Sequence, residues 1–146
     1  MEEYQNLHSL IKLFGDSIFF VGRADDTRVA KIESMLSVKL PNSYIWFLKH
    51  YGHGGVPGVE ILGNGLAEIP SCVRASFFWQ KNGLPTNFVV IEDSGADYVV
   101  CLDTSRVKNG ECPVVDWEYG VGVGKWYYET FFDYLAARLK ESFNLQ

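Results

Sequence analysis

The chain has 146 residues and a formal net charge of −5, and 47% of its residues are hydrophobic against 21% charged. This much apolar surface offsets the conformational entropy of folding, which excludes intrinsic disorder and indicates one domain over residues 1–146. The longest stretches without a charged residue run for ten residues, as in His50–Val59, whereas a membrane-spanning helix needs about 20 apolar positions. We therefore expect a protein that does not cross a membrane and, because no secretory segment is visible, a cytoplasmic location.

The first half of the chain has the apolar periodicity of three amphipathic helices. Asp25, Asp26 and Thr27 offer N-cap oxygens to the second helix, which we expect to end near Ser37, and Pro41 and Gly52 bracket the third. The glycine-rich stretch 52–58 is expected to be a loop. The three apolar stripes are Tyr4, Leu7, Ile11 and Phe14; Val29, Ile32 and Leu36; and Tyr44, Phe47, Leu48 and Tyr51.

The second half of the chain is rich in strand signals, with a short helix expected over Cys72–Gln80. Unbroken apolar runs at 88–91 and 98–102 flank a polar turn and predict a central antiparallel hairpin. Further strands are expected from Val59 to Leu62, at Val114–Trp117 after the turn dipeptide Asn109-Gly110, and around Gly124–Tyr128, with a closing helix from about Thr130. The fold class is α+β, with N-terminal helices and a C-terminal helix packed on a mainly antiparallel sheet.

Motifs for catalysis or for binding a metal or cofactor are weak in this sequence. Its three cysteines lack Cys-x-x-Cys spacing and are interpreted as free thiols, with Cys101 in an apolar run as a packing residue. The 120–125 glycine run lacks the spacing of a phosphate-binding loop and is interpreted as a hairpin, and His50 and His53 lack a fixed third ligand. We predict no catalytic residue, no metal and no cofactor.

Acidic residues are concentrated in one part of the chain. Residues 92–118 hold seven acidic and two basic side chains, so this segment alone has a net charge of −5 and the other 119 residues are neutral overall. Such a field repels nucleic acid and attracts cationic partners. Two other interpretations stay open: the carboxylates are simply solvated, or Glu92, Asp93 and Asp116 form a small catalytic or cation-binding site.

The run from Val29 through Glu33, Leu40-Pro41 and Phe47-Leu48 to Tyr51-Gly52 resembles the signature of the SUKH superfamily, the Smi/Knr type. In that family, a helix carrying the glutamate leads through Leu-Pro into a second helix. Ser37 stands where a glycine is frequent in the family. The resemblance continues through Ile61-Leu62-Gly63, Val89–Asp93, Asp97–Asp103, Pro113–Trp117 and Phe131–Leu135.

The resemblance implies an α+β domain, mostly without enzymatic activity, that serves bacteria as an immunity protein. Such a protein binds the C-terminal toxic domain, often a basic nuclease, of a secreted polymorphic toxin; the alternative within the superfamily is a regulatory interaction module without a toxin partner. Our hypothesis is that acidic side chains dock the toxin domain and that two aromatic side chains anchor it. The expected partner-binding residues are Glu92, Asp93, Asp97, Asp103, Asp116, Trp117, Glu118 and Tyr119.

Overall fold

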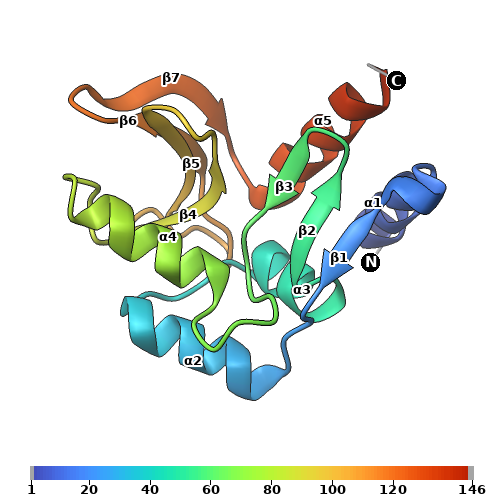
Figure 1. Ribbon diagram of the computed structural model, residues 1–146, viewed down its shortest axis with the longest axis horizontal. Coiled ribbons are helices and arrows are strands. Elements are labelled where there is room, and N and C mark those ends of the chain that lie inside the picture. Colours follow the sequence, from blue (N-terminus) through green and yellow to red (C-terminus); the bar gives the residue numbers. More distant parts are fainter. Residues whose placement is uncertain (1, 145–146) are drawn as a thin grey trace.

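The computed structural model describes residues 2–144, except for the side chains of residues 125 and 126. Helices come first, strands dominate the second half, and a helix follows the last strand, so the expected α+β class is confirmed (Figure 1). The elements are α1 (Glu2–Lys12), the 3-10 turn η1 (Gly15–Ser17), β1 (Phe19–Val21), α2 (Asp26–Leu36), α3 (Asn42–His50), β2 (His53–Val56), β3 (Val59–Ile61), α4 (Ser71–Gln80), β4 (Phe88–Asp93), β5 (Tyr98–Asp103), β6 (Val114–Glu118), β7 (Gly122–Tyr128) and α5 (Phe131–Asn144).

The strands form two antiparallel sheets, one with the order β1-β2-β3 and the other with the order β4-β5-β6-β7. The second sheet confirms the expected hairpin of β4 and β5 and the two strands that follow it. A backbone hydrogen bond of 2.8 Å from the Leu62 N–H to the Ile91 carbonyl joins the end of β3 to β4. The sheets are therefore attached at one end and separate beyond it.

The glycine-rich stretch after α3 forms strand β2, and our expectation of a loop there was wrong. A Cβ atom at Gly54 would lie 1.8 Å from the carbonyl oxygen of Phe19 in β1, and one at Gly55 would lie 1.8 Å from that of Val59 in β3. Only glycine allows backbones to approach this closely. These glycines therefore make strand pairing possible on both sides of β2, in contrast to their usual role in turns.

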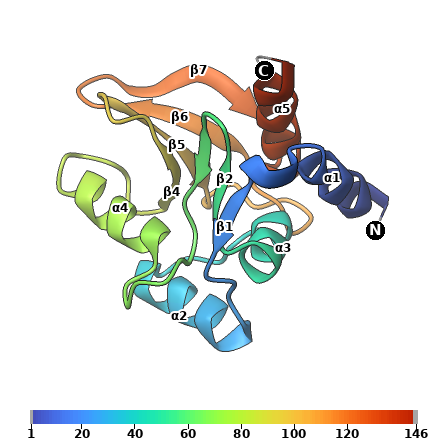
Figure 2. The same cartoon turned by 45° about the vertical axis from the view of Figure 1, so that its right-hand side comes forward.

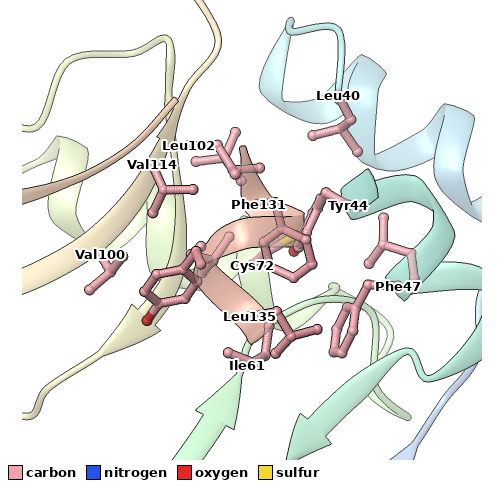
Figure 3. Packing of buried hydrophobic residues seen from close by; sticks show 14 of the residues in the cluster. Leu40, Tyr44, Phe47, Ile61, Cys72, Val100, Leu102, Val114, Phe131 and Leu135 are labelled. Carbon is pink, nitrogen blue, oxygen red and sulfur yellow. The ribbon is translucent and has the colours of Figure 1, made fainter. Parts of the chain in front are cut away.

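Helices cover both faces of the β4–β7 sheet (Figure 2). On one face α4 closes a smaller core that contains Trp79 and Trp117. On the other face α5 and α3 close the main core, where Tyr44, Phe47 and Phe131 are fully buried. Figure 3 shows this main core, with side chains from the helices meeting Val100, Leu102 and Val114 of the sheet.

The connection between α2 and α3 explains the signature residues around Leu40-Pro41. Ser37 ends α2 with φ of 55°, a left-handed conformation that favours glycine, which accounts for the residue frequent at this position in the family. The Glu33 carboxylate accepts a 2.8 Å hydrogen bond from the Leu40 N–H. Pro41 has no capping side chain, and Glu111 from a distant loop accepts bonds from the N–H and hydroxyl of Ser43 at 2.9 and 2.6 Å. One acidic residue of the 92–118 segment is therefore a helix cap.

Candidate functional site

A cleft of about 870 Å³ opens where the two sheets separate. Strands β4, β5 and β6 form one wall of the cleft, and β1 and β3 form the other wall. Residues of α5 complete the lining. The residues that line it include five carboxylates and one guanidinium, together with the aromatic rings of Phe19, Tyr98 and Tyr134. The acidic residues are Glu60, Glu92, Asp93, Asp116 and Glu141, and the basic residue is Arg138.

The cleft continues the main core along the same face of the β4–β7 sheet. Leu102 pairs with Val114 in the core, and two residues further along the strands Val100 pairs with Asp116 on one side and Glu92 on the other. Because side chains alternate between faces, these rows point to the same side. Within two residues along the strands, the side chains on this face of the sheet therefore change from apolar to acidic.

Glu92 is held by an ion pair at the inner part of this cleft. Its oxygens accept bonds of 3.0 and 3.1 Å from the guanidinium of Arg138 in α5, which also donates to the Gly58 carbonyl at 3.1 Å. Burial raises the pKa of Glu92, while Arg138 opposes that shift, and the bond to Glu92 raises the pKa of Arg138. Glu92 therefore joins α5 to β4 through this ion pair.

Asp116 differs from Glu92 because none of the described side chains forms an ion pair with it. Its Oδ1 atom is buried and has no hydrogen-bond partner among the described residues. The strand register shifts beside it, and Gly124 of β7 lies so close that a Cβ atom there would be 2.1 Å from Oδ1. A carboxylate oxygen buried without a donor is costly, so the contact of Oδ1 with β7 lowers the stability of the fold.

Four of the expected residues, one of which also lines the cleft, lie at the exposed ends of the β4–β5 and β6–β7 hairpins. Asp93, Asp97, Glu118 and Tyr119 are all exposed, and the Tyr119 N–H donates to the Asp97 carbonyl at 2.8 Å, which holds the two hairpin ends together. Asp93 also accepts a 2.9 Å bond from the indole of Trp79. Together they form an acidic surface beside the cleft, with Tyr119 as its exposed aromatic residue.

Two expected contact residues lie elsewhere, which corrects the expectation from sequence. Trp117 is only 5% exposed and packs edge-on against Trp79 under α4, with 6.1 Å between ring centroids. Asp103 is buried and accepts bonds from Ser105 and Arg106, so it stabilises the turn after β5. We therefore leave both residues out of the candidate site.

Comparison with known proteins places the chain in a family. The sequence model of the family described as "SMI1-KNR4 cell-wall" (SUKH_5) matches residues 4–140. The chain belongs to the SUKH superfamily. Proteins of this superfamily are generally non-catalytic immunity or regulatory proteins.

A solved structure has the same fold. It is the crystal structure of a protein from Pseudomonas syringae pv. tomato, which is 14% identical in sequence and superposes with a TM-score of 0.67. The alignment covers 88% of this chain and 95% of that chain. At this identity the similarity concerns the fold, and the site rests on the residues of this SUKH protein alone.

Several residues of the cleft were missed by sequence reasoning. Glu60 stands on the short strand β3, while Tyr134, Arg138 and Glu141 follow one another along α5 at spacings of four and three. That spacing places them on one face of a helix. The sequence did contain a signal for them. Charged residues follow a tyrosine on the same face of this helix, which indicates that the core ends part-way along it.

A hydrogen-bonded Ser71–His53–Glu60 chain resembles a catalytic relay in this SUKH protein. The His53 ring nitrogens lie 2.7 Å from the Ser71 hydroxyl and 3.2 Å from the Glu60 carboxylate. However, the hydroxyl accepts a bond from the Gly63 N–H, and the Cys72 N–H beside it donates to the Gly63 carbonyl. These bonds occupy the groups that an activated nucleophile and its oxyanion site require, so the arrangement fixes the loop before α4.

Among residues 2–144, no group of three or more His, Cys, Asp and Glu side chains is arranged to hold a metal ion. Burial raises the pKa of the Cys72 thiol to about 11 and that of Cys112 to about 12, which suppresses the thiolate. Cys101 is fully buried in the smaller core, as expected for a packing residue. Within the described part of the chain, the helices are too short or too polar to span a bilayer.

Proposed function

We propose that this SUKH protein is an immunity protein that binds and neutralises the toxic C-terminal domain of a secreted polymorphic toxin in the cytoplasm of the producing cell. The toxic domain would be a basic one, such as a nuclease. The observation that carries the proposal is the acidic cleft, which five acidic residues and one arginine line, together with the exposed carboxylates at the hairpin ends beside it.

Charge supports a nuclease as the partner. A nuclease holds phosphate groups with lysine and arginine side chains, and those same groups attract a carboxylate surface. The exposed Asp93, Asp97 and Glu118 extend the negative charge of the cleft to the hairpin ends. Long-range attraction between such surfaces raises the association rate, and it decreases as salt is added.

The proposed contact area needs both the cleft and the hairpin ends. A specific inhibitor complex buries about 1,600 Å² in total, which is more than two hairpin ends supply. The cleft rim adds Glu60, Glu141 and Gly58, which lies in the turn between β2 and β3. Tyr98 and Tyr119, which are 45% and 54% exposed, take the role of aromatic anchors in place of the buried Trp117.

Co-expression with the toxic domain encoded by a neighbouring gene tests the proposal. We expect cell survival, co-purification at a ratio of one to one, and an affinity that falls with rising salt. The charge reversals Asp97→Lys and Glu118→Lys should weaken binding, whereas Glu68→Lys, the same change beside α2 at the other end of the molecule, should not. Loss of protection with the intact protein, or binding that is insensitive to salt and to Asp97→Lys, would contradict the proposal.

A regulatory interaction module is the second candidate, and the description "SMI1-KNR4 cell-wall" of the matching family favours it. Capture of a partner that lacks toxicity in the cell, through the same acidic surface, would support this function. The two candidates share a binding mode and differ in what the partner does when it is free.

A further inference from the structure

We infer that the outer surface of helix α4 binds an acidic protein segment, in which carboxylates flank an apolar side chain. This surface consists of four exposed residues at the helical spacing i, i+3, i+4 and i+7, namely Arg74, Phe77, Phe78 and Lys81. It points away from the β4–β7 sheet and lies on the opposite side of that sheet from α5 (Figure 2). The inference concerns a second surface of the molecule and does not depend on the immunity function.

The inner side of α4 is fixed to the sheet. The Val90 N–H donates to the Ser76 hydroxyl at 2.9 Å, and the Trp79 indole donates to the Asp93 carboxylate at 2.9 Å. Cys72, on the same side of the helix, is fully buried. Because these contacts hold the helix in place, its outer side is presented on a rigid element, which lowers the entropy lost when a partner binds.

Two adjacent phenylalanines are exposed on this helix, although its other large apolar side chains are buried. Phe77 is 39% exposed and Phe78 is 57% exposed. Ile69 precedes the helix, is 44% exposed and lies beside Arg74, whose guanidinium donates to the Ile69 carbonyl at 3.3 Å. Aromatic and arginine side chains are enriched at protein interfaces, and exposed apolar groups bordered by polar residues are typical of binding surfaces.

Charge indicates the chemistry of the partner. The sequence has no acidic residue from Ile69 to Ile91, and neither Arg74 nor Lys81 forms an ion pair with a described residue. Seven helical residues separate these two cations by about 10 Å, with the phenyl rings between them. Carboxylates at this separation, on either side of an apolar side chain, are complementary to both cations and to the rings.

The surroundings of α4 favour a short acidic segment over a nucleic acid. The acidic hairpin ends lie next to the helix, because Asp93 accepts the bond from Trp79, and they repel a longer polyanion that extends beyond the outer surface. Two cations are also fewer than the several phosphate contacts on which nucleic-acid binding depends. A protein segment that spans only Arg74 to Lys81 avoids the acidic hairpin ends.

A designed peptide tests the inference on the full chain. A helical peptide with two glutamates seven residues apart and leucines between them is titrated into the ¹⁵N-labelled protein, and chemical shifts are followed at the amides of α4. We expect saturable shifts at residues 74–81 that weaken with rising salt. The same peptide with glutamines in place of the glutamates should bind about fivefold more weakly, the effect of losing two exposed ion pairs. Equal binding of the two peptides would overturn the inference.

Variants test the assignment to this surface. Arg74→Glu combined with Lys81→Glu should weaken binding of the glutamate peptide by at least about tenfold, because attraction becomes repulsion. Phe78→Ala should also weaken it. Lys140→Glu, at an exposed position of α5, and Leu13→Ala, at an exposed position after α1, are the matched controls and should leave binding unchanged. Unaltered binding by the double charge reversal would contradict the assignment.

Two other occupants of the surface are outcomes that would overturn the inference. Tighter binding of poly(U) RNA than of the glutamate peptide would assign the surface to a nucleic acid. Self-association in sedimentation experiments that the double charge reversal abolishes would assign it to a second copy of this chain, which has acidic hairpin ends. The acidic cleft lies on the other face of the sheet, so either outcome leaves the immunity function standing.

Discussion

On the α4 face of the β4–β7 sheet, apolar side chains continue as far as Val99 and Trp117, where Asp93 bonds the Trp79 indole, whereas on the α5 face they give way to carboxylates one row earlier. The first face ends with Trp117 packed against Trp79. The second passes from Leu102 and Val114 to the row that contains Glu92 and Asp116. The difference arises because α4 lies along its face of the sheet, while on the other face the β1–β3 sheet separates and leaves a cleft.

Residues that are neighbours in the sequence lie on different faces of the folded sheet. Val115, Asp116 and Trp117 are consecutive, yet the outer two pack in the smaller core and Asp116 lines the cleft. A strand turns successive side chains to opposite faces, so an acidic cluster in the sequence is divided when it folds. Changes on the α4 face should therefore alter stability without altering partner binding, and changes on the cleft face should alter both or binding alone.

The largest expected effect comes from the α4 face. Trp117→Ala removes a buried indole and should lower the free energy of unfolding by about 3–5 kcal/mol, measured by urea denaturation. Among the molecules that remain folded, affinity for the toxic domain should be unchanged. Tyr119→Ala is the matched change at an exposed position, where stability should hold and affinity should fall. A loss of affinity in folded Trp117→Ala would break the distinction between the faces.

The ion pair in the cleft should give the next largest effect. Arg138→Met leaves Glu92 buried without its partner and should cost about 3 kcal/mol. Adding Glu92→Leu should recover most of this loss, because the unpaired charge is then gone. A double-mutant cycle in urea measures the coupling, and additive losses would show that the pair contributes little.

The same pair predicts a dependence on pH. Because burial raises the folded-state pKa of Glu92, its contribution to stability is fully present below the unfolded pKa and is lost as pH rises through the folded value. Removing Arg138 raises that pKa further. The destabilisation caused by Arg138→Met should therefore be larger at about pH 7 than at about pH 4.

Glu111 is an acidic residue of the same segment that lies on neither face of the sheet. Its carboxylate caps α3 through Ser43. Glu111→Ala should lower the free energy of unfolding by about 1–2 kcal/mol, as for other lost helix caps, without changing affinity for the toxic domain. Glu111→Gln keeps an acceptor oxygen and should cost less, and an equal loss in both variants would argue against a capping role.

The smallest effect should have the opposite sign. Asp116→Asn removes a charge whose buried oxygen has no partner, so we expect a gain of about 1 kcal/mol in the free energy of unfolding. The gain should accompany weaker partner binding, which is the usual relation between stability and function at a binding site. Asp97→Asn, at an exposed position, should change stability by less than about 0.5 kcal/mol. A destabilised Asp116→Asn would show that the carboxylate has a structural role.

The sequence by itself determined the local elements and the family. Helical periodicity identified α1, α2 and α3, apolar runs identified β4 and β5, and the Leu40-Pro41 signature led to the correct superfamily. These features depend on neighbours within a few residues, which is the range over which side-chain spacing and capping act. The order of β4 to β7 followed for the same reason, because each strand pairs with the next one in the chain.

Only the tertiary structure decided which acidic residues share a surface. Glu92 was placed against Arg138, Asp103 within its own turn and Glu111 on α3, and these partners are distant in sequence or defined by the folded turn. The glycines of β2 became strand residues because β1 and β3 approach them from both sides. The packing of whole helices and strands sets where a layer of the core ends. The cleft around Asp116 therefore appears only in the folded protein.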